Sequence, residues 1–278
     1  MPAMTREFLV ALDGSPGSDA AARRALGMAS ALGASVRGIH VVDTAQLEAS
    51  FIADLSGSVG FQPFLNLSGE LRRALAAAGE AIVADFEGKR EAAGVPGSAR
   101  VVEGRVVGEM VRAARSAERV FLGLHGTGEG RGKSPGGHAD ALVRRLPIPT
   151  FLSTDDGEPI RRPLAAFDGS DRAVRALRAA AEIAGTTGAR LTVLTVSTSP
   201  EEIEARRRAA HETLPELAGA YDFVAAAGHP EDAILARAGE NDLIAIGSHG
   251  HGRIAELVLG STTERVLRKT TISVLCVP

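Results

Sequence analysis

A loop rich in glycine and hydroxyl groups is the strongest chemical feature of this sequence. It runs from Gly247 through Gly250 to the segment Gly260–Thr263, directly after the apolar run 242–246. Glycines let the backbone approach a ligand without interference from Cβ. A helix beginning near Gly260 would add free backbone N–H groups and hydroxyls, which together suit a phosphate chain. Judged by residue types alone, an ordinary strand–loop–helix turn with normal caps explains the same pattern.

Much of this chemistry occurs twice along the chain. An Asp-Gly-Ser sequence follows an apolar run at Asp13 and again, 155 positions later, at Asp168. A Gly-x-His-Gly sequence begins at Gly123 and again, 124 positions later, at Gly247. Because each offset holds over a long stretch, the pattern indicates a tandem duplication. The difference of 31 positions is extra sequence in the first copy, between about residues 45 and 98.

A polar linker at 154–159 separates the copies, so we expect domains at 1–154 and 160–278, the first with a helical insert at about 45–98. Short apolar runs alternate with Ala- and Leu-rich helical stretches. The expected strands are 7–12, 35–42, 99–103, 119–124, 149–153, 163–167, 190–196, 222–227, 242–247 and 272–277. The expected helices include 17–32, 67–93, 106–116, 171–187, 200–219 and 230–239.

This alternation predicts an α/β fold with two tandem, doubly wound, parallel five-stranded sheets flanked by helices. In such sheets, ligands bind beyond the carboxyl ends of the strands. Asp13, Asp168 and both glycine loops follow expected strands, so we expect one candidate site in each copy.

The second loop carries a family signature. Gly247-x2-Gly250-x9-Gly260-Ser261 matches at every position the G-2x-G-9x-G-(S/T) pattern of ATP-binding universal stress proteins. Asp168-Gly-Ser and the closing segment 272–278 agree with the same family, in which tandem arrangements are familiar. The chain resembles universal stress proteins over nearly its whole length. The resemblance implies a Rossmann-like, adenine nucleotide alpha-hydrolase-like fold and ATP as the ligand, alone or with Mg²⁺.

The resemblance also implies roles for residues of the second copy. Asp168 would accept a hydrogen bond from the adenine amine, and Val196 would pack against the adenine ring. The remaining residues would line the base, ribose or phosphates: Ala166, Phe167, Gly247, His249, Gly250, Gly260, Ser261, Thr262 and Thr263. Two simpler roles stay open, with Asp168 as a capping aspartate and His249 as a residue that positions backbone without proton transfer.

The first copy departs from this pattern. Its corresponding positions are Asp13, Val41, Gly123, His125, Gly126, Gly136 and Gly137. Gly137-His138-Ala139 stands where the second copy has Ser261-Thr262-Thr263, and each missing hydroxyl would be worth about 1 kcal/mol or more against a phosphate. Arg131 or Lys133 is a candidate replacement, and an empty loop is the alternative, so occupancy of this site stays open.

The same loop contains an apparent P-loop that fails on spacing. Gly128 and Gly132 enclose three residues where the motif requires four. Walker-type hydrolysis is therefore not expected, and no residue is predicted to be catalytic.

Composition narrows the function classes. The chain has 9 Phe, 1 Tyr, no Trp and a net charge of −3, which argues against a stacking surface or basic footprint for nucleic acid. No apolar run approaches the roughly 18 residues that a membrane helix needs. The 7 His residues have no metal-ligand spacing, and the single cysteine, Cys276, is expected to be buried and inert. We expect a cytoplasmic protein that binds neither nucleic acid nor membrane.

Three functions compete. The favoured one is an ATP-binding, nucleotide-dependent regulator in stress response, with weak ATPase activity at most. The alternatives are an enzyme that hydrolyses ATP slowly or cleaves between its α- and β-phosphates, and a nucleotide-independent scaffold. Strands 149–153 and 272–277 are expected to pair within the chain as an intramolecular pseudo-dimer. A homodimer of tandem chains stays open, and the insert is either a cover over the first site or a contact surface.

Overall fold

A computed structural model of the chain describes residues 6–44, 63–126, 137–154, 158–217, 220–237, 239, 242–248 and 259–278, with backbone alone for 63–68. The first half contains β1 (Glu7–Ala11), α1 (Pro16–Leu32), β2 (Ser35–Asp43), α3 (Pro63–Ala92), β3 (Gly97–Gly104), α4 (Val106–Ala113), η1 (Ala114–Ser116), β4 (Arg119–Gly123), α5 (Gly137–Arg145) and β5 (Thr150–Ser153). The second half contains β6 (Pro163–Ala166), α6 (Asp171–Thr187), β7 (Leu191–Val196), α7 (Pro200–Thr213), η2 (Pro215–Leu217), β8 (Tyr221–Ala226), α8 (Pro230–Ala236), β9 (Leu243–Gly247), α9 (Ser261–Lys269) and β10 (Ser273–Val277).

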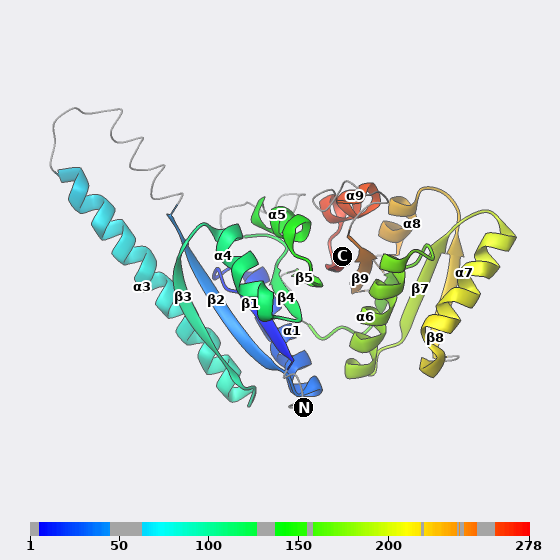
Figure 1. The fold of residues 1–278 in the computed structure, drawn as a ribbon, viewed down its shortest axis with the longest axis horizontal. Coiled ribbons are helices and arrows are strands. Elements are labelled where there is room, and N and C mark those ends of the chain that lie inside the picture. The colour runs from blue at the N-terminus through cyan, green and yellow to red at the C-terminus, as the bar shows by residue number, and fades with distance from the viewer. Residues whose placement is uncertain are drawn as a thin grey trace.

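The strands form one sheet in the order β3-β2-β1-β4-β5-β10-β9-β6-β7-β8 (Figure 1). Within each half the paired strands run parallel, and the strand order reverses between the first and fourth strands, as in a doubly wound fold. The antiparallel pair β5 and β10, with Phe151 opposite Leu275, joins the halves. The predicted fold class and the expected pairing of these two strands are confirmed, and the two sheets are continuous.

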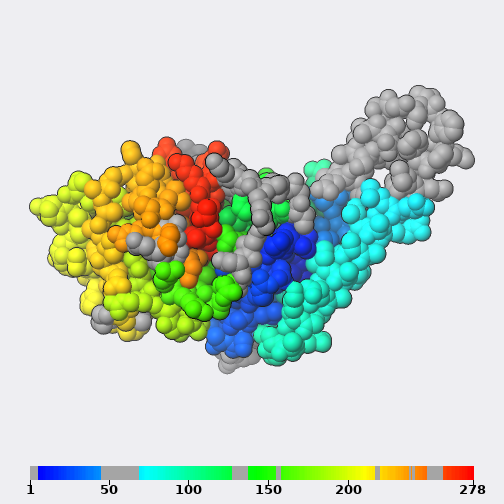
Figure 2. Space-filling view, turned by 180° about the vertical axis from the view of Figure 1, so that it is seen from behind, coloured from blue at the N-terminus to red at the C-terminus, as the bar shows by residue number. Residues whose placement is uncertain are grey.

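Helices cover both faces of this sheet. Successive strand residues point to opposite faces, so Phe8 and Val10 pack with α1 and α3 on one side, whereas Leu9 packs with α4 and α5 on the other. Both cores run across the two halves, with α6 and α7 on the first face and α8 and α9 on the second. The space-filling view shows the halves in contact, with α3 at the far end of the first half (Figure 2).

The helix that follows the first strand has the same boundaries in both halves. The hydroxyls of Ser15 and Ser170 accept hydrogen bonds from the N–H groups of Ser18 and Ala173, at 3.1 and 3.2 Å. Gly33 and Gly188 end these helices in the left-handed region, at φ 64° and 66°. The sequence predicted both ends of each helix because caps are local chemistry.

The helix α7 is shorter than predicted, and it is also shorter than its counterpart α3 in the first half. The predicted helix 200–219 ends at Thr213, because Pro215 lacks the N–H that would continue it. Its counterpart α3 has 30 residues against 14 in α7, so part of the extra sequence in the first half lengthens a helix that extends past the sheet (Figure 1). Residues 45–62 of the insert lie outside the described residues.

Within the described part of the chain, none of the helices combines the length and apolar character needed to cross a bilayer.

Candidate functional site

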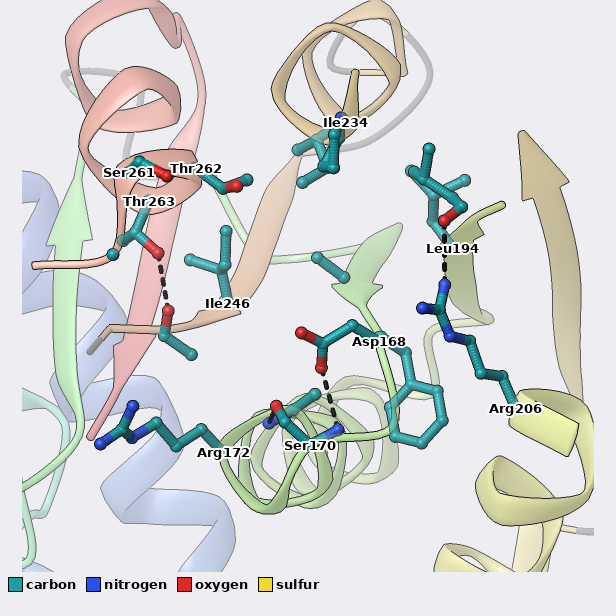
Figure 3. Close-up of a pocket in the computed structure, with 17 residues that line it drawn as sticks. Asp168, Ser170, Arg172, Leu194, Arg206, Ile234, Ile246, Ser261, Thr262 and Thr263 are labelled. Carbon is teal, nitrogen blue, oxygen red and sulfur yellow. Dashed lines mark hydrogen bonds between the residues drawn. The ribbon is translucent and has the colours of Figure 1, made fainter. Parts of the chain in front are cut away.

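A cavity of about 420 Å³ opens at the carboxyl ends of β6, β7 and β9 (Figure 3). It lies where the strand order of the second half reverses, between β6 and β9. Its volume is within the range of about 300–1,000 Å³ usual for small-molecule sites. The lining residues are Ala166, Phe167, Asp168, Ser170, Arg172, Ala173, Leu194, Val196, Arg206, Pro230, Ile234, Ile246, Gly247, Gly260, Ser261, Thr262 and Thr263.

The start of α9 forms a polar end of this cavity. Gly260 is the N-cap, and its own N–H donates to the carbonyl of Ser248, the residue after β9, at 3.1 Å. Ser261 and Thr262 bring their hydroxyls to the first helical turn (Figure 3). The N–H groups of a first turn have no partner within the helix, so they can bind an anion.

Thr263 differs from the role that the resemblance implied for its hydroxyl. The side chain is buried, and its hydroxyl donates to the carbonyl of Gly247 at 2.6 Å. This bond ties the start of α9 to the end of β9 (Figure 3). The hydroxyls available at the polar end are therefore those of Ser261 and Thr262.

Asp168 serves a turn and lines the cavity. Its Oδ1 accepts from the N–H of Ser170 at 2.9 Å, and Gly169 between them has φ 83°. Asp13 makes the same turn in the first half, where its Oδ1 accepts from the N–H of Ser15 at 2.8 Å. The capping role is thus present in both halves, and the Asp168 carboxylate is also exposed to the cavity.

Apolar side chains form the remaining walls. Leu194 and Val196 come from the end of β7, Ile234 from α8 and Ile246 from β9 (Figure 3). These groups surround a space in which a flat ring would contact carbon on several sides.

Sequence reasoning missed Arg206. It begins the basic run Arg206-Arg207-Arg208 on α7, a pattern typical of a solvated, salt-bridged helix face; Arg206 does pair with Glu202, but its side chain is only 17% exposed. Arg206 lines the cavity, and its Nη1 donates to Thr195 Oγ1 at 3.0 Å and to the Val196 carbonyl at 2.9 Å. The charge pattern gave no signal of this role, because an ion pair one turn apart, as between Glu202 and Arg206, is also typical of a solvated helix face.

The glycines that end β4 and β9 also have a packing reason. A Cβ at Gly247 would lie 2.9 Å from Cβ of Arg172, another lining residue that sequence reasoning missed. A Cβ at Gly123 would lie 2.9 Å from the backbone nitrogen of Ser18. Glycine at these positions lets α6 and α1 pack closely on the sheet, whether or not a ligand is bound.

The structure brings together nine of the eleven positions predicted in the second copy, and these nine line the cavity; the other two are His249 and Gly250. Those two lie outside the described residues, as do Gly136, Arg131 and Lys133 of the first copy.

In the first copy the predicted positions lie around the ends of three strands. Asp13 follows β1, Val41 belongs to β2 and Gly123 ends β4, while Gly137 begins the helix α5. The hydroxyl of Ser15 donates to the carbonyl of His125 at 3.4 Å, and a Cβ at Gly126 would lie 3.4 Å from Asp13 Oδ2.

Redox or metal chemistry finds little support in the described residues. No group of three or more His, Cys, Asp or Glu among them could hold a metal ion. Complete burial raises the pKa of the Cys276 thiol to about 12, so the reactive thiolate is scarce at neutral pH.

The fold and the site define a protein of two doubly wound α/β domains with a small-molecule-sized cavity in the second. Its relatives make the class specific. The Universal stress protein family matches residues 4–153 and 159–278, so the chain belongs to this family.

Individual relatives agree over the whole length. The chain is 27% identical to "Universal stress protein Slr1230" of Synechocystis over 97% of this chain and 99% of that protein. A crystal structure of a universal stress protein from Archaeoglobus fulgidus is similar at a TM-score of 0.72, with 23% identity over 99% of this chain and 97% of that one. A functionally unknown protein from Pseudomonas aeruginosa is similar at 0.65, with 19% identity over 98% of this chain and 92% of its own. At these identities, the two structures show the shared fold.

Proposed function

We propose that the second domain binds ATP and that the chain acts in the cytoplasm as a nucleotide-dependent regulator in stress response. One observation carries the proposal: an apolar space and a helix N-terminus with two available hydroxyls belong to the same cavity, with Asp168 also at its wall. The apolar space suits an adenine ring, and the start of α9 suits phosphates. Asp168 then accepts from the adenine amine.

The proposed ligand is held rather than rapidly cleaved. The sequence predicts no catalytic residue, and we expect turnover well below about 1 per second. Any Mg²⁺ would be held by the phosphates with help from Ser261 or Thr262, because Mg²⁺ usually keeps several waters and phosphate ligands.

We further propose that the two domains differ in occupancy. Gly137 and His138 stand where the second domain has Ser261 and Thr262, so the start of α5 lacks the hydroxyls of α9. The chain would then carry one nucleotide as an intramolecular pseudo-dimer. A homodimer of tandem chains would be seen as a doubled molar mass in light scattering.

Mass spectrometry of nucleotide released from the denatured, purified protein tests the binding directly. We expect ATP at about one per chain. Two per chain would refute the difference between the domains, and failure to bind added ATP in calorimetry would refute ATP binding.

Variants locate the site. We expect Ser261→Ala with Thr262→Ala to weaken ATP binding by about 100-fold or more, since each of the two hydroxyl hydrogen bonds to a charged phosphate is worth about 1.5 kcal/mol or more. Thr271→Ala is the control, because Thr271 is exposed beyond the other end of α9. Equal affinity in all three proteins would contradict a phosphate site at α9.

A further inference from the structure

Arg206 stands across the cavity from the hydroxyls of α9 (Figure 3). Its guanidinium donates to Thr195 Oγ1 and the Val196 carbonyl, and it pairs with Glu202. Thr195 is fully buried, and the Arg206 side chain is 17% exposed. Three partners on two elements therefore hold the guanidinium in one orientation at the apolar end.

Two backbone carbonyls of lining residues at this end already accept hydrogen bonds. The Val196 carbonyl accepts from Arg206, at 2.9 Å. The carbonyl of Leu194 accepts from the N–H of Phe167, at 2.8 Å. A guanidinium has five N–H donors. The hydrogen bonds of Arg206 to Thr195, Val196 and Glu202 use three of them. Arg206 therefore keeps unused N–H donors beside the apolar walls, and such donors call for an acceptor atom on the ligand.

Among the described residues, the corresponding turn of the first half meets an apolar side chain instead. A Cβ at Gly14 would lie 3.0 Å from Cδ1 of Ile82 on α3. In the second half, a Cβ at Gly169 would lie 3.8 Å from Cγ of Arg206 on α7. The side chain of Ile82 in the first half thus takes the place of the aliphatic part of the Arg206 side chain in the second half.

We propose that Arg206 is a base-reading residue, which donates a hydrogen bond to a ring nitrogen of the bound adenine. This inference rests on the proposed ATP site and extends it, because it makes affinity depend on the base as well as on the phosphates. Asp168 and Arg206 then offer the base an acceptor and a donor, which matches an edge carrying an amine and a bare ring nitrogen.

The test removes the proposed hydrogen bond in two ways, by changing the base of the ligand and by replacing Arg206. Calorimetry compares ATP with 1-deaza-, 3-deaza- and 7-deaza-ATP, each of which lacks one ring nitrogen. We expect one analogue to bind the unmodified protein about 10- to 100-fold more weakly than ATP, the range for a hydrogen bond to a charged group. We expect Arg206→Met to lose a similar factor for ATP and to bind that analogue and ATP equally.

Arg208→Met is the matched control, an exposed arginine two positions along the same helix. Its affinities should equal those of the unmodified protein. Arg206→Lys should retain part of the discrimination, which a merely structural role would not predict. Thermal unfolding of each variant reports whether it is folded, and the analogue series on the unmodified protein needs no variant.

The outcomes separate the two proposals. If ATP binds but all three analogues bind equally well, base reading by Arg206 is overturned while the ATP site stands. Base reading is also overturned if the Arg206→Met variant binds the weakest analogue more weakly than ATP by the same factor as the unmodified protein does. If the unmodified protein binds no ATP, the proposed function fails, and this inference fails with it.

Discussion

At the scale of single residues, the two aspartates after the first strands show how one turn can carry two roles. Asp13 and Asp168 each accept from a backbone N–H two residues later, at 2.8 and 2.9 Å. Asp168 also lines the described cavity. An asparagine keeps the oxygen that the turn needs and removes the charge, so this substitution separates the turn from the ligand contact.

We predict that Asp168→Asn weakens ATP binding by about fivefold, because a hydrogen bond to a charged group is worth roughly 1 kcal/mol more than a neutral one. The thermal midpoint should change little, since the turn is kept. Asp13→Asn is the internal control, with unchanged affinity. Calorimetry and thermal unfolding measure both effects. A loss of stability with unchanged affinity would leave Asp168 as a capping residue alone.

At the scale of elements, the long helix α3 packs on β2 through a glycine. A Cβ at Gly79 would lie 2.6 Å from Cδ2 of His40 and 3.3 Å from Cγ1 of Val101. The imidazole of His40 has little freedom to move, because its Nδ1 lies 2.7 Å from the carbonyl of Leu12. Gly79 therefore permits a close contact between helix and sheet that a larger residue would disrupt.

We predict that Gly79→Ala lowers the free energy of unfolding by about 1–3 kcal/mol, the usual cost of overpacking. Gly88→Ala in the same helix should instead raise it by up to about 1 kcal/mol, since nothing lies within 4 Å of that position and alanine favours the helix. Urea denaturation of both variants decides the matter. Equal stability of the two variants would show that α3 does not pack as described.

At the scale of the whole molecule, ion pairs reinforce the joint between the halves. Glu182 of α6 accepts from Arg119 Nη2 at 2.7 Å and from Arg6 Nη2 at 2.6 Å, and both arginines belong to the first half. Arg119 is only 4% exposed, so its charge depends on this partner. Burial raises the pKa of Glu182, but the hydrogen bonds and charges of Arg119 and Arg6 outweigh burial and leave the pKa below its usual value.

A carboxyl group whose pKa is lowered by folding stabilises the fold above its unfolded pKa, near 4.3, and that contribution is lost as pH falls through the folded value. We predict that Glu182→Gln lowers the free energy of unfolding by about 2 kcal/mol at pH 7. The difference in the free energy of unfolding between this variant and the unmodified protein should shrink as the pH falls below about 4, because Glu182 then becomes protonated in the unmodified protein.

Urea denaturation across this pH range measures the effect. Glu118→Gln is the matched control, because Glu118 pairs with Arg6 within the first half and its side chain is 39% exposed. A Glu182→Gln variant as stable as the Glu118→Gln variant at pH 7 would contradict a role of this cluster at the joint.

The sequence by itself determined the duplication, the alternation of strands and helices, the extent of the helices 17–32 and 171–187, and the position of the loop at Gly247. Each of these depends on residue types close together in the chain, where periodicity and capping act locally. The pairing of β5 with β10 was also predictable, because two apolar strands at the ends of their sheets need partners.

Only the tertiary structure decided which further side chains reach the cavity and which hydroxyls stay available in it. Arg206 reaches it because α7 packs beside β7, and Thr263 is turned toward Gly247 by the register of α9 on β9. Glu182 meets Arg119 across 63 positions of sequence. Such contacts depend on how packed elements are placed against one another, which local periodicity does not encode. The loop at Gly247 indicated where a ligand would bind, and the packing of α7 placed the cation that would read its base.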